Sequence, residues 1–462
     1  MLVGREAELA KLEELYRGER FECVIVYGRR RVGKTRLISE FLKEKEGLYI
    51  SAVESGAPEN LEIFSQALLH FASGARTEAA FPDFRQALDY IFTMARERRF
   101  VLAIDEFPYL AGAYRPISSL LQNYIDREHE QSKLFLILCG SSLSFMENQV
   151  LGYQSPLYGR RTAQFLIRPL NYFDSIRFYQ SFKNEDLAVI YGLTAGVPQY
   201  LLQFDEKKSL TRNIQDNFFD PAAYLFEEPT NLVKQECREP AQYNAVIRAV
   251  ARGSTRLSEI ASRTALSTGL CSNYISTLLS LGILKKETPL GMEGGKKTFY
   301  ALADSMFRFW YRFVPDNMAL IQQREKNLIW ERVAPQLPAF MGPVFEEICK
   351  QWLWRENLAG RLPILFTSLG RWWGNDPVRK EEAEIDILAP SDNEELIIGE
   401  CKWTNAKLGP ETVRLLLERA RLFPQPVKYF YFFSKSGFTK ACEKDAAAYD
   451  NLRLLSFSGM FG

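Results

Sequence analysis

An eight-residue segment near the N-terminus combines glycines, a lysine and a threonine at spacings that suit phosphate binding. Residues 28–35 read Gly-Arg-Arg-Arg-Val-Gly-Lys-Thr and match G-x-x-x-x-G-K-[ST] at every fixed position. Gly28 and Gly33 let the backbone fold so that its N–H groups surround phosphate oxygens. Lys34 can reach the outer phosphates, and the hydroxyl of Thr35 can ligate Mg²⁺. The segment predicts a nucleoside triphosphate site, with ATP and Mg²⁺ as cofactors.

The residues on both sides of this loop have the pattern of a buried strand followed by a helix. Glu22–Tyr27 contains consecutive Val, Ile and Val, as in a parallel strand that is buried on both faces. Apolar residues then recur at helical spacing from Arg36 onward. These elements disfavour the alternative, an ordinary glycine turn before a helix. The loop residues expected to contact the nucleotide are Gly28, Arg29, Arg30, Arg31, Val32, Gly33, Lys34, Thr35 and Arg36.

Two adjacent carboxylates end a second apolar run, residues 100–106. Acids at the end of a buried strand are costly unless they meet a cation or water. Beside a phosphate-binding loop, this predicts that Asp105 ligates Mg²⁺ and Glu106 activates the attacking water. The alternative is a strand that runs out into a polar loop. After a third run, residues 134–139, Ser141 is favoured over Ser142 as a sensor of the γ-phosphate, against a role in capping a turn.

Four further residues upstream and downstream are candidates for the same site. Arg160 and Arg161 lead into a strand at residues 164–167. They could stabilise charge on a transferring phosphoryl group, in cis or across a subunit contact, or they could be solvated surface residues. Gly4 and Arg5 open an amphipathic helix just upstream of the loop, and this position suggests packing beside the adenine.

A second set of acids lies in the C-terminal third. Asp386 and Glu400 fall on two predicted strands of a hairpin, which brings them together although they are 14 residues apart. Two acids can hold Mg²⁺ for in-line cleavage of a phosphodiester, and Lys402 could steer the water. Glu346, from a preceding helix, could complete the metal shell. The alternative is charged residues on an exposed strand face.

The middle of the chain, residues 242–332, follows the order helix, helix, helix, two-stranded wing of a winged helix-turn-helix. Between residues 241 and 332 there are 13 Lys+Arg against 7 Asp+Glu, so this part has a basic excess. The wing carries Lys285, Lys286, Lys296 and Lys297, which could contact phosphates. The presumed reading helix, residues 269–281, is predicted to have an apolar face that includes Leu270. It presents Ser272, Asn273, Ser276 and Thr277 and has no arginine. A packing module inside a larger ATPase is therefore an equal alternative to a DNA-binding module. The aromatic residues at 307–313 are expected to be core residues.

The length and composition of the chain limit the number of domains and the kinds of site that it can contain. The 462 residues exceed one ordinary core, and 47% hydrophobic with 25% charged residues is usual for a globular protein. Seven scattered cysteines and two histidines argue against a zinc site, and we expect a cytoplasmic protein with no membrane span. The expected domains are residues 1–170, an ATPase core; 171–238, a helical lid; 239–333, the winged helix and the helix after it; and 334–462, a nuclease-like domain.

The N-terminal motifs resemble an archaeal-type P-loop ATPase family of the STAND/AAA-like class. The segments GRE, GRRRVGKT, AIDEF, LCGSS, LYGRRT and AGVPQYL occur in this order over about half of the chain. The resemblance implies that Pro198 lies near the base and that Arg160 or Arg161 lies near the phosphates.

The C-terminal third is predicted to contain a helix over residues 341–355 and an aromatic turn at 370–374. Its motifs, including GRWWG, resemble the DUF234 domain that follows this ATPase, and the PD-(D/E)xK nuclease fold. One departure from the nuclease pattern is Ile385, which stands where a proline is usual. The expected fold class is therefore multi-domain α/β: a P-loop parallel sheet, a winged helix and a PD-(D/E)xK-like domain.

Two functions from different classes fit these motifs. The first is an ATPase whose nucleotide state controls an Mg²⁺-dependent nuclease-like domain that acts on nucleic acid. The second is a STAND-type ATP-driven switch that binds DNA or protein without cleaving it. Nucleic acid is the expected partner, with self-association through the ATPase domain as a further expectation.

Overall fold

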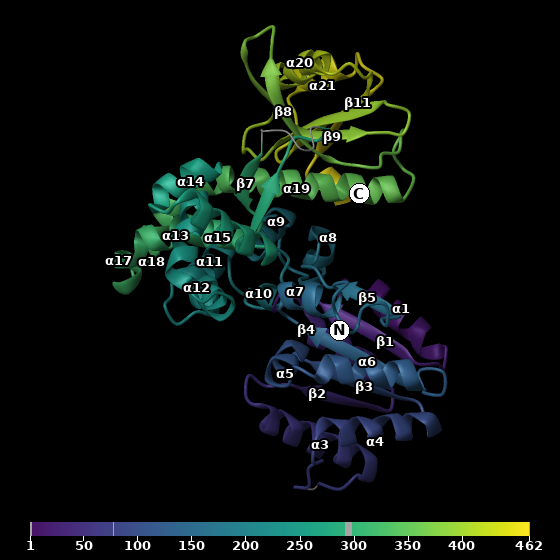
Figure 1. Ribbon diagram of the computed structural model, residues 1–462. Helices are drawn as coiled ribbons and strands as arrows, with labels where there is room; N and C mark the ends of the chain where they lie inside the picture. The colour runs from purple at the N-terminus through teal and green to yellow at the C-terminus, as the bar shows by residue number, and fades with distance from the viewer. Residues whose placement is uncertain (1, 77, 292–297, 462) are drawn as a thin grey trace. The chain divides into compact units, whose positions relative to one another are not determined.

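The structure is a computed structural model that describes residues 2–76, 78–291 and 298–461 (Figure 1). It divides into two compact units. The first unit runs to Leu170 and includes Val197–Gln199, and the second comprises Asn171–Gly196 and the chain from Tyr200 onward. None of the helices in the described ranges is long and apolar enough to cross a membrane.

The first unit is built on a five-stranded parallel sheet. Its strand order is β2-β3-β4-β1-β5, so β1 lies between β4 and β5. Every residue of β1, β3 and β4 is buried, as their runs of Val, Ile and Leu predict. The strands are β1 (Glu22–Tyr27), β2 (Gly47–Ser51), β3 (Phe100–Asp105), β4 (Leu134–Gly140) and β5 (Ala163–Leu166).

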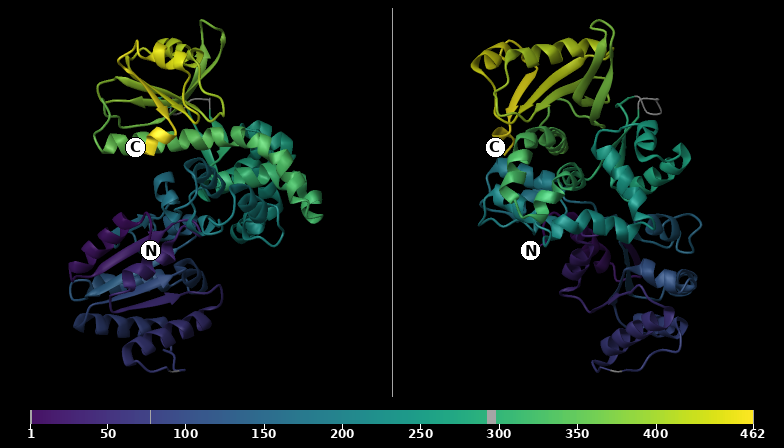
Figure 2. Two further views of the ribbon diagram at one scale, coloured as in Figure 1. Left: turned by 180° about the vertical axis from the view of Figure 1, so that it is seen from behind. Right: turned by 90° about the vertical axis from the view of Figure 1, so that its left-hand side faces the viewer.

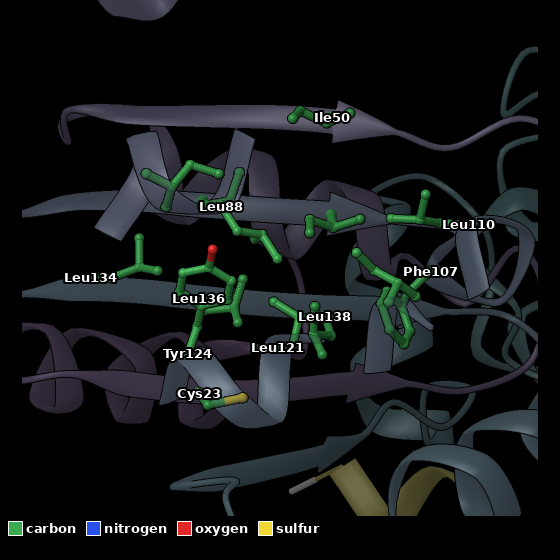
Figure 3. Close-up of a cluster of buried hydrophobic side chains, with 14 of the residues drawn as sticks. Cys23, Ile50, Leu88, Phe107, Leu110, Leu121, Tyr124, Leu134, Leu136 and Leu138 are labelled. Carbon is green, nitrogen blue, oxygen red and sulfur yellow. The ribbon is translucent and has the colours of Figure 1, made fainter. Parts of the chain in front are cut away.

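Helices cover both faces of this sheet. Side chains of α3 to α6 and of the strands form one core, in which Leu136, Leu138 and Phe107 are buried (Figure 3). A smaller core on the other face joins the strands to α1 and α2. These helices are α1 (Glu6–Arg17), α2 (Lys34–Leu42), α3 (Ala57–Ser73), α4 (Phe84–Glu97), α5 (Phe107–Ala113) and α6 (Ile117–Glu128).

The second unit contains the predicted winged-helix elements. They are α13 (Pro240–Ala251), α14 (Leu257–Thr264), α15 (Thr268–Ser280), β6 (Leu284–Glu287) and β7 (Phe299–Leu302). Lys296 and Lys297 lie outside the described residues. Leu270, expected on the apolar face of α15, is exposed instead because it lies in the first turn, ahead of the buried Cys271, Tyr274 and Ile275. The aromatic side chains of α16 (Ser305–Phe313) are core residues, as predicted.

The C-terminal part of this unit has a mixed five-stranded sheet in the order β12-β11-β10-β9-β8. Helix α19 (Leu337–Leu358) lies along one face of the sheet, and α20 and α21 cover the other (Figure 2). These elements are β8 (Gly370–Asp376), β9 (Glu381–Pro390), β10 (Leu396–Lys402), α20 (Pro410–Arg419), β11 (Val427–Ser434), α21 (Lys440–Ala446) and β12 (Leu452–Ser456).

Two expectations for this part are wrong. Gly370–Gly374, read as an aromatic turn, belongs to strand β8, because tryptophans suit a pleated surface and the segment pairs with β9. Helix α19 begins at Leu337 rather than Met341, since Pro338 is tolerated in the first helical turn. The remaining helices are α7 (Leu143–Phe145), α8 (Tyr172–Ser175), α9 (Asn184–Thr194), α10 (Pro198–Leu201), α11 (Leu210–Phe218), α12 (Tyr224–Glu236), α17 (Met318–Gln322) and α18 (Lys326–Val333).

The buried sheet of the first unit predicts a specific loss of stability. Leu136→Ala removes a fully buried side chain from β4 and should lower the free energy of unfolding of this unit by about 2–5 kcal/mol. Hydrogen exchange of peptides from β3 and β4 measures the change. Leu166→Ala, at a site that is 37% exposed on the edge strand, is the matched control. All seven tryptophans lie at or after Trp310, so an unchanged tryptophan fluorescence transition should show that the second unit is intact. Equal exchange in the two variants would contradict the assigned core.

Candidate nucleotide site and acidic site

The loop between β1 and α2 needs glycine at both of its fixed glycine positions. Gly28 has φ of 152°, and a Cβ there would lie 2.2 Å from the carbonyl oxygen of Ile167. Gly33 has φ of 94° and caps the N-terminus of α2 in the left-handed conformation. Side chains at these positions would clash or strain the backbone. The loop therefore ends with the N–H groups of the first turn of α2 available for phosphate.

Lys34 folds back over the loop that precedes it. Its Nζ donates hydrogen bonds to the carbonyl oxygens of Gly28 at 2.8 Å and Arg29 at 3.0 Å. The side chain is only 6% exposed, and burial lowers the pKa of its ammonium group. The two carbonyl oxygens offset part of the cost of burying the ammonium group. They hold it at the loop, where it can bind an anion.

Asp105 accepts hydrogen bonds from three neighbouring elements. Thr35 Oγ1 donates to its Oδ2 at 2.8 Å, and the Tyr49 hydroxyl donates to the same oxygen. The backbone N–H of Glu106 donates to Oδ1 at 2.9 Å. Burial by itself would raise the pKa of Asp105, but hydrogen bonds from Cys139, Tyr49 and Thr35 lower it overall. Asp105 is thus held as a carboxylate next to the Thr35 hydroxyl, and this is a donor set that suits Mg²⁺.

Glu106 and Ser141 lie side by side at the carboxyl ends of β3 and β4. Ser141 Oγ donates to the Glu106 carboxylate, at 3.0 Å from Oε1 and 2.9 Å from Oε2. Glu106 has φ of 51°, a left-handed conformation that is uncommon outside glycine. Such strain is characteristic of functional positions. The predicted base and the predicted sensor are therefore in direct contact.

Two residues named from the N-terminal motifs also lie at the loop. A Cβ at Gly33 would lie 3.9 Å from Cγ of Pro198, so this proline borders the loop. The Arg5 guanidinium donates to the carbonyl oxygens of Val32, at 3.1 Å, and Arg168. Arg5 thus links the loop to the backbone at Arg168 through hydrogen bonds. Gly4 precedes it with φ of 65°.

Arg160 and Arg161 have different surroundings. Arg160 forms a two-pronged ion pair with Asp126 of α6, through Nε to Oδ1 and through a terminal guanidinium nitrogen to Oδ2, each at 2.8 Å. Arg161 stacks over the ring of Tyr158, 5.9 Å from its centroid, and its charge acts on Tyr27, the residue before Gly28. The pair left undecided in the sequence therefore divides: Arg160 is committed to α6, and Arg161 is the better candidate for the phosphates.

The C-terminal acids are brought together by strand register. Strands β9 and β10 pair antiparallel up to Ile387 opposite Gly399, and the next residues on the two strands are Asp386 and Glu400. Both carboxylates are buried, at 8% and 7% exposure. Asp386 Oδ2 accepts a hydrogen bond from the backbone N–H of Cys401 at 2.9 Å. The two acids thus share a buried strand end.

Lys402 neutralises part of this charge. Its Nζ contacts the Glu400 carboxylate and lies 4.0 Å from Asp386 Oδ2. Burial raises the pKa of Glu400, and the nearby Asp386 raises it further. Burial alone would lower the pKa of Lys402, but Glu400 and Asp386 raise it overall. The three side chains form one interacting group.

Glu346 does not complete a metal shell in this structure. Its carboxylate lies 3.3 Å from Nε of Arg371, and it lines a different cavity from Asp386 and Glu400. Across the ranges that the structure describes, no three or more His, Cys, Asp or Glu side chains are grouped so as to hold a metal ion. Glu346 is thus paired with Arg371 in the described structure, and its role as a third metal ligand stays a prediction.

Several residues at the two sites were missed from the sequence. Tyr49 was overlooked because its only signal is its place in β2, the strand next to β3. A cavity of about 640 Å³ opens beside Asp386 and Glu400, and part of its lining comes from α20. The sequence showed α20 as an amphipathic helix but not which of its charges face the acids. The cavity-lining residues are Arg379, Glu384, Asp386, Glu400, Lys402, Glu411, Thr412, Arg414, Leu415, Glu418 and Arg419.

The parallel sheet, the loop before α2 and the two acids that end β3 define a Walker-type P-loop ATPase. Residues 2–204 match the family described as an ATPase domain predominantly from Archaea, and residues 310–413 match DUF234, described as archaeal and bacterial proteins of unknown function. An uncharacterized protein of Methanocaldococcus jannaschii is 30% identical over 409 residues, which are 88% of each chain. The chain belongs to this family of archaeal-type ATPases with a C-terminal DUF234 domain, and it is an ATPase.

Two further proteins are similar over smaller or more distant matches. An uncharacterized ATP-binding protein of Methanocaldococcus jannaschii is 48% identical over 46 residues, which are 10% of this chain and 78% of that protein. A Walker-type ATPase of Pyrococcus abyssi has a similar fold, with a TM-score of 0.50, 20% identity, and coverage of 67% of this chain and 96% of its own.

We propose that Glu106 activates the attacking water, which gives a first test of the site. Glu106→Gln should lower kcat for ATP hydrolysis by about 10²–10⁴-fold, because the amide cannot accept the proton. ATP binding should stay almost unchanged, whereas Lys34→Ala should abolish turnover. Steady-state hydrolysis and equilibrium ATP binding are the measurements. Glu130→Gln, at an exposed site, is the matched control. Normal turnover in Glu106→Gln would place the base elsewhere.

We propose that Arg161, rather than Arg160, acts on the phosphates. Arg161→Ala should lower kcat about tenfold or more, with a smaller change in KM. Arg160→Ala loses an exposed ion pair and should cost about 1 kcal/mol of stability or less, with kcat nearly unchanged. Hydrolysis rates and thermal unfolding of both variants separate the roles. A larger loss of kcat in Arg160→Ala would reverse the assignment.

Proposed function

We propose that this ATPase uses its nucleotide state to control an Mg²⁺-dependent site in the C-terminal domain that cleaves phosphodiesters of nucleic acid. The observation that carries the proposal is the buried pair Asp386 and Glu400, with Lys402 between them, at the edge of an open cavity. Burial of two carboxylates beside a lysine costs stability, so their presence at this position indicates a function. Their grouping supports a catalytic role.

The donor set of this site fits a hard divalent cation. Asp386 and Glu400 offer carboxylate oxygens, the ligands that Mg²⁺ prefers. The bound ion would lower the pKa of a coordinated water and offset charge on the phosphate. Lys402, which is 39% exposed, can meet both the acids and a phosphodiester that enters the cavity. Glu346 would join the metal ligands only after it leaves Arg371.

In the ATPase unit, the chain's own residues supply the binding and the proton transfer. The amides at the start of α2 and the ammonium of Lys34 would bind the phosphates. Thr35 and Asp105 would hold Mg²⁺, which would offset the negative charge of the phosphates. Glu106 would take the proton of the attacking water. Ser141, now bonded to Glu106, would exchange this contact for one with the γ-phosphate.

The winged helix is proposed as a relay rather than a reader of sequence. The backbone N–H of Leu290 donates to the carbonyl of Arg371 at 2.9 Å, and the rings of Phe299 and Trp373 stack 5.4 Å apart. These contacts seat the hairpin on strand β8 and favour a packing role. Nucleic acid would then bind at the cavity beside Asp386. We also propose self-association through the ATPase unit.

A second function is favoured by the position of Glu346. Its contact with Arg371 leaves Asp386 and Glu400 without the expected third metal ligand among the described residues. A site with this ligand set is also suited to binding a cation and a backbone phosphate without cutting. The second candidate is therefore a STAND-type switch whose C-terminal domain binds nucleic acid or protein.

The nuclease proposal is tested with purified full-length protein, Mg²⁺ and a supercoiled plasmid, with and without ATP. Asp386→Asn weakens a metal ligand and Lys402→Ala removes the lysine ammonium. Each should lower the nicking rate by about 10²-fold or more. Glu382→Gln, an exposed acid of the same strand, is the matched control. Single-stranded DNA and RNA complete the substrate set. Nicking that survives in both variants would be contamination, and saturable binding without any cleavage would favour the switch.

A further inference from the structure

A second cavity lies within the second unit, apart from the one at Asp386. Its volume is about 490 Å³, within the range of about 300–1,000 Å³ that is usual for small-molecule sites. It is lined by residues of α9, α13, the β6–β7 hairpin, α16, α19 and β8. None of the residues that line the 640 Å³ cavity lines this one. It is a separate site.

Four cationic side chains converge on this cavity from four elements, namely Lys285, Arg308, Lys350 and Arg371. Two of them already have acidic partners. Lys285 lies 2.5 Å from Glu287, and Arg371 contacts Glu287 and other carboxylates. Arg308 and Lys350 have no carboxylate within 4.0 Å in the described part of the chain. Neither therefore has a carboxylate from the described ranges in direct contact, and Glu346, which also lines the cavity, acts on both from a longer distance.

Arg308 is the more constrained of these two. Its guanidinium lies over the ring of Phe340, 4.7 Å from the centroid, and donates to the carbonyl oxygen of Phe340 at 3.1 Å. Its Nε is buried with no hydrogen-bond partner among the described residues. Burial lowers the pKa of Arg308 to about 10. Arg308 thus has no carboxylate of the described chain in direct contact, and a buried guanidinium of this kind favours an anion in the cavity that it lines.

The rest of the lining suits an organic body attached to an anion. Tyr191, Val250, Tyr300 and Val344 provide apolar and aromatic surface on the cavity wall. The Glu347 carboxylate also lines the cavity and can accept hydrogen bonds from ligand hydroxyls. A bare phosphate would use the cations alone and leave this wall uncovered.

We propose that this cavity binds a small organic phosphate of nucleoside monophosphate size. Its phosphate contacts Arg308 and Lys350, and its ring or sugar lies against the tyrosines. The proposal does not depend on the phosphate-binding loop, and its phosphate contacts, Arg308 and Lys350, are not residues of the proposed nuclease site. It gives the second unit a ligand of its own, held between the winged-helix hairpin and α19.

The test is isothermal titration calorimetry of the full-length Lys34→Ala protein, in which the phosphate-binding loop is disabled. AMP and ribose 5-phosphate are the probes, and adenosine is the uncharged comparison. At least one phosphate should bind saturably, with adenosine about tenfold weaker or more. Adding Lys350→Gln should weaken the phosphate by about tenfold. Lys286→Gln, at an exposed lysine of the same hairpin outside the cavity, should leave affinity unchanged.

Arg308→Gln provides a second measurement, with folding checked by tryptophan fluorescence because this residue is packed against Phe340. A folded Arg308→Gln protein should bind the phosphate about tenfold more weakly. Failure of both phosphates to bind at millimolar concentration would overturn the proposal. Equal effects of Lys350→Gln and Lys286→Gln would also overturn it, since the contribution would then be general surface charge.

Discussion

The hydrogen bonding of one buried carboxylate ties the nucleotide site together. Asp105 ends a strand that is buried along its whole length, so its charge must be satisfied by neighbours. Thr35 follows β1, Tyr49 lies in β2, Cys139 lies in β4, and the N–H of Glu106 follows β3 itself. One carboxylate thus joins the ends of four parallel strands. A displacement of Asp105 would break its hydrogen bonds to Thr35, Tyr49 and the backbone of Glu106 together.

The acidic site of the second unit meets the same constraint in another way. Asp386 and Glu400 are like charges at one buried strand end, and burial together with the charge of Asp386 raises the pKa of Glu400. The N–H of Cys401 and the ammonium of Lys402 offset only part of the repulsion between these like charges. A hydrophobic pair would be more stable at this strand end. The retained charges are best explained by a ligand that needs them, and a divalent cation with a phosphate has that character.

The sequence predicted the parts of both sites whose residues stand next to a strong local pattern. The loop at 28–35, the acids after β3 and the hairpin of Asp386 and Glu400 all lie next to buried apolar runs. The hydrophobic periodicity and the length of these runs were enough to predict the strands. Partners supplied by distant elements could not be found this way. Tyr49 and the separation of Arg160 from Arg161 depend on which elements pack together, and spacing along one chain does not contain that information.

The misread segment at β8 shows why such partners matter. As a turn, Gly370–Gly374 would have contributed only two tryptophans to a surface. As a strand paired with β9, it places Arg371 against Glu287 of the hairpin and Glu346 of α19. Glu346 also lies close enough to Asp386 for that charge to raise the pKa of its carboxyl, after the larger effect of burial. One arginine therefore contacts the winged helix and also the acid that the metal site lacks. A shift of the hairpin that moved Arg371 away would break the ion pair between Arg371 and Glu346. Glu346 would then be available to bind the same metal cation as Asp386. We propose that the rest of the chain controls the acidic site through this contact between Arg371 and Glu346.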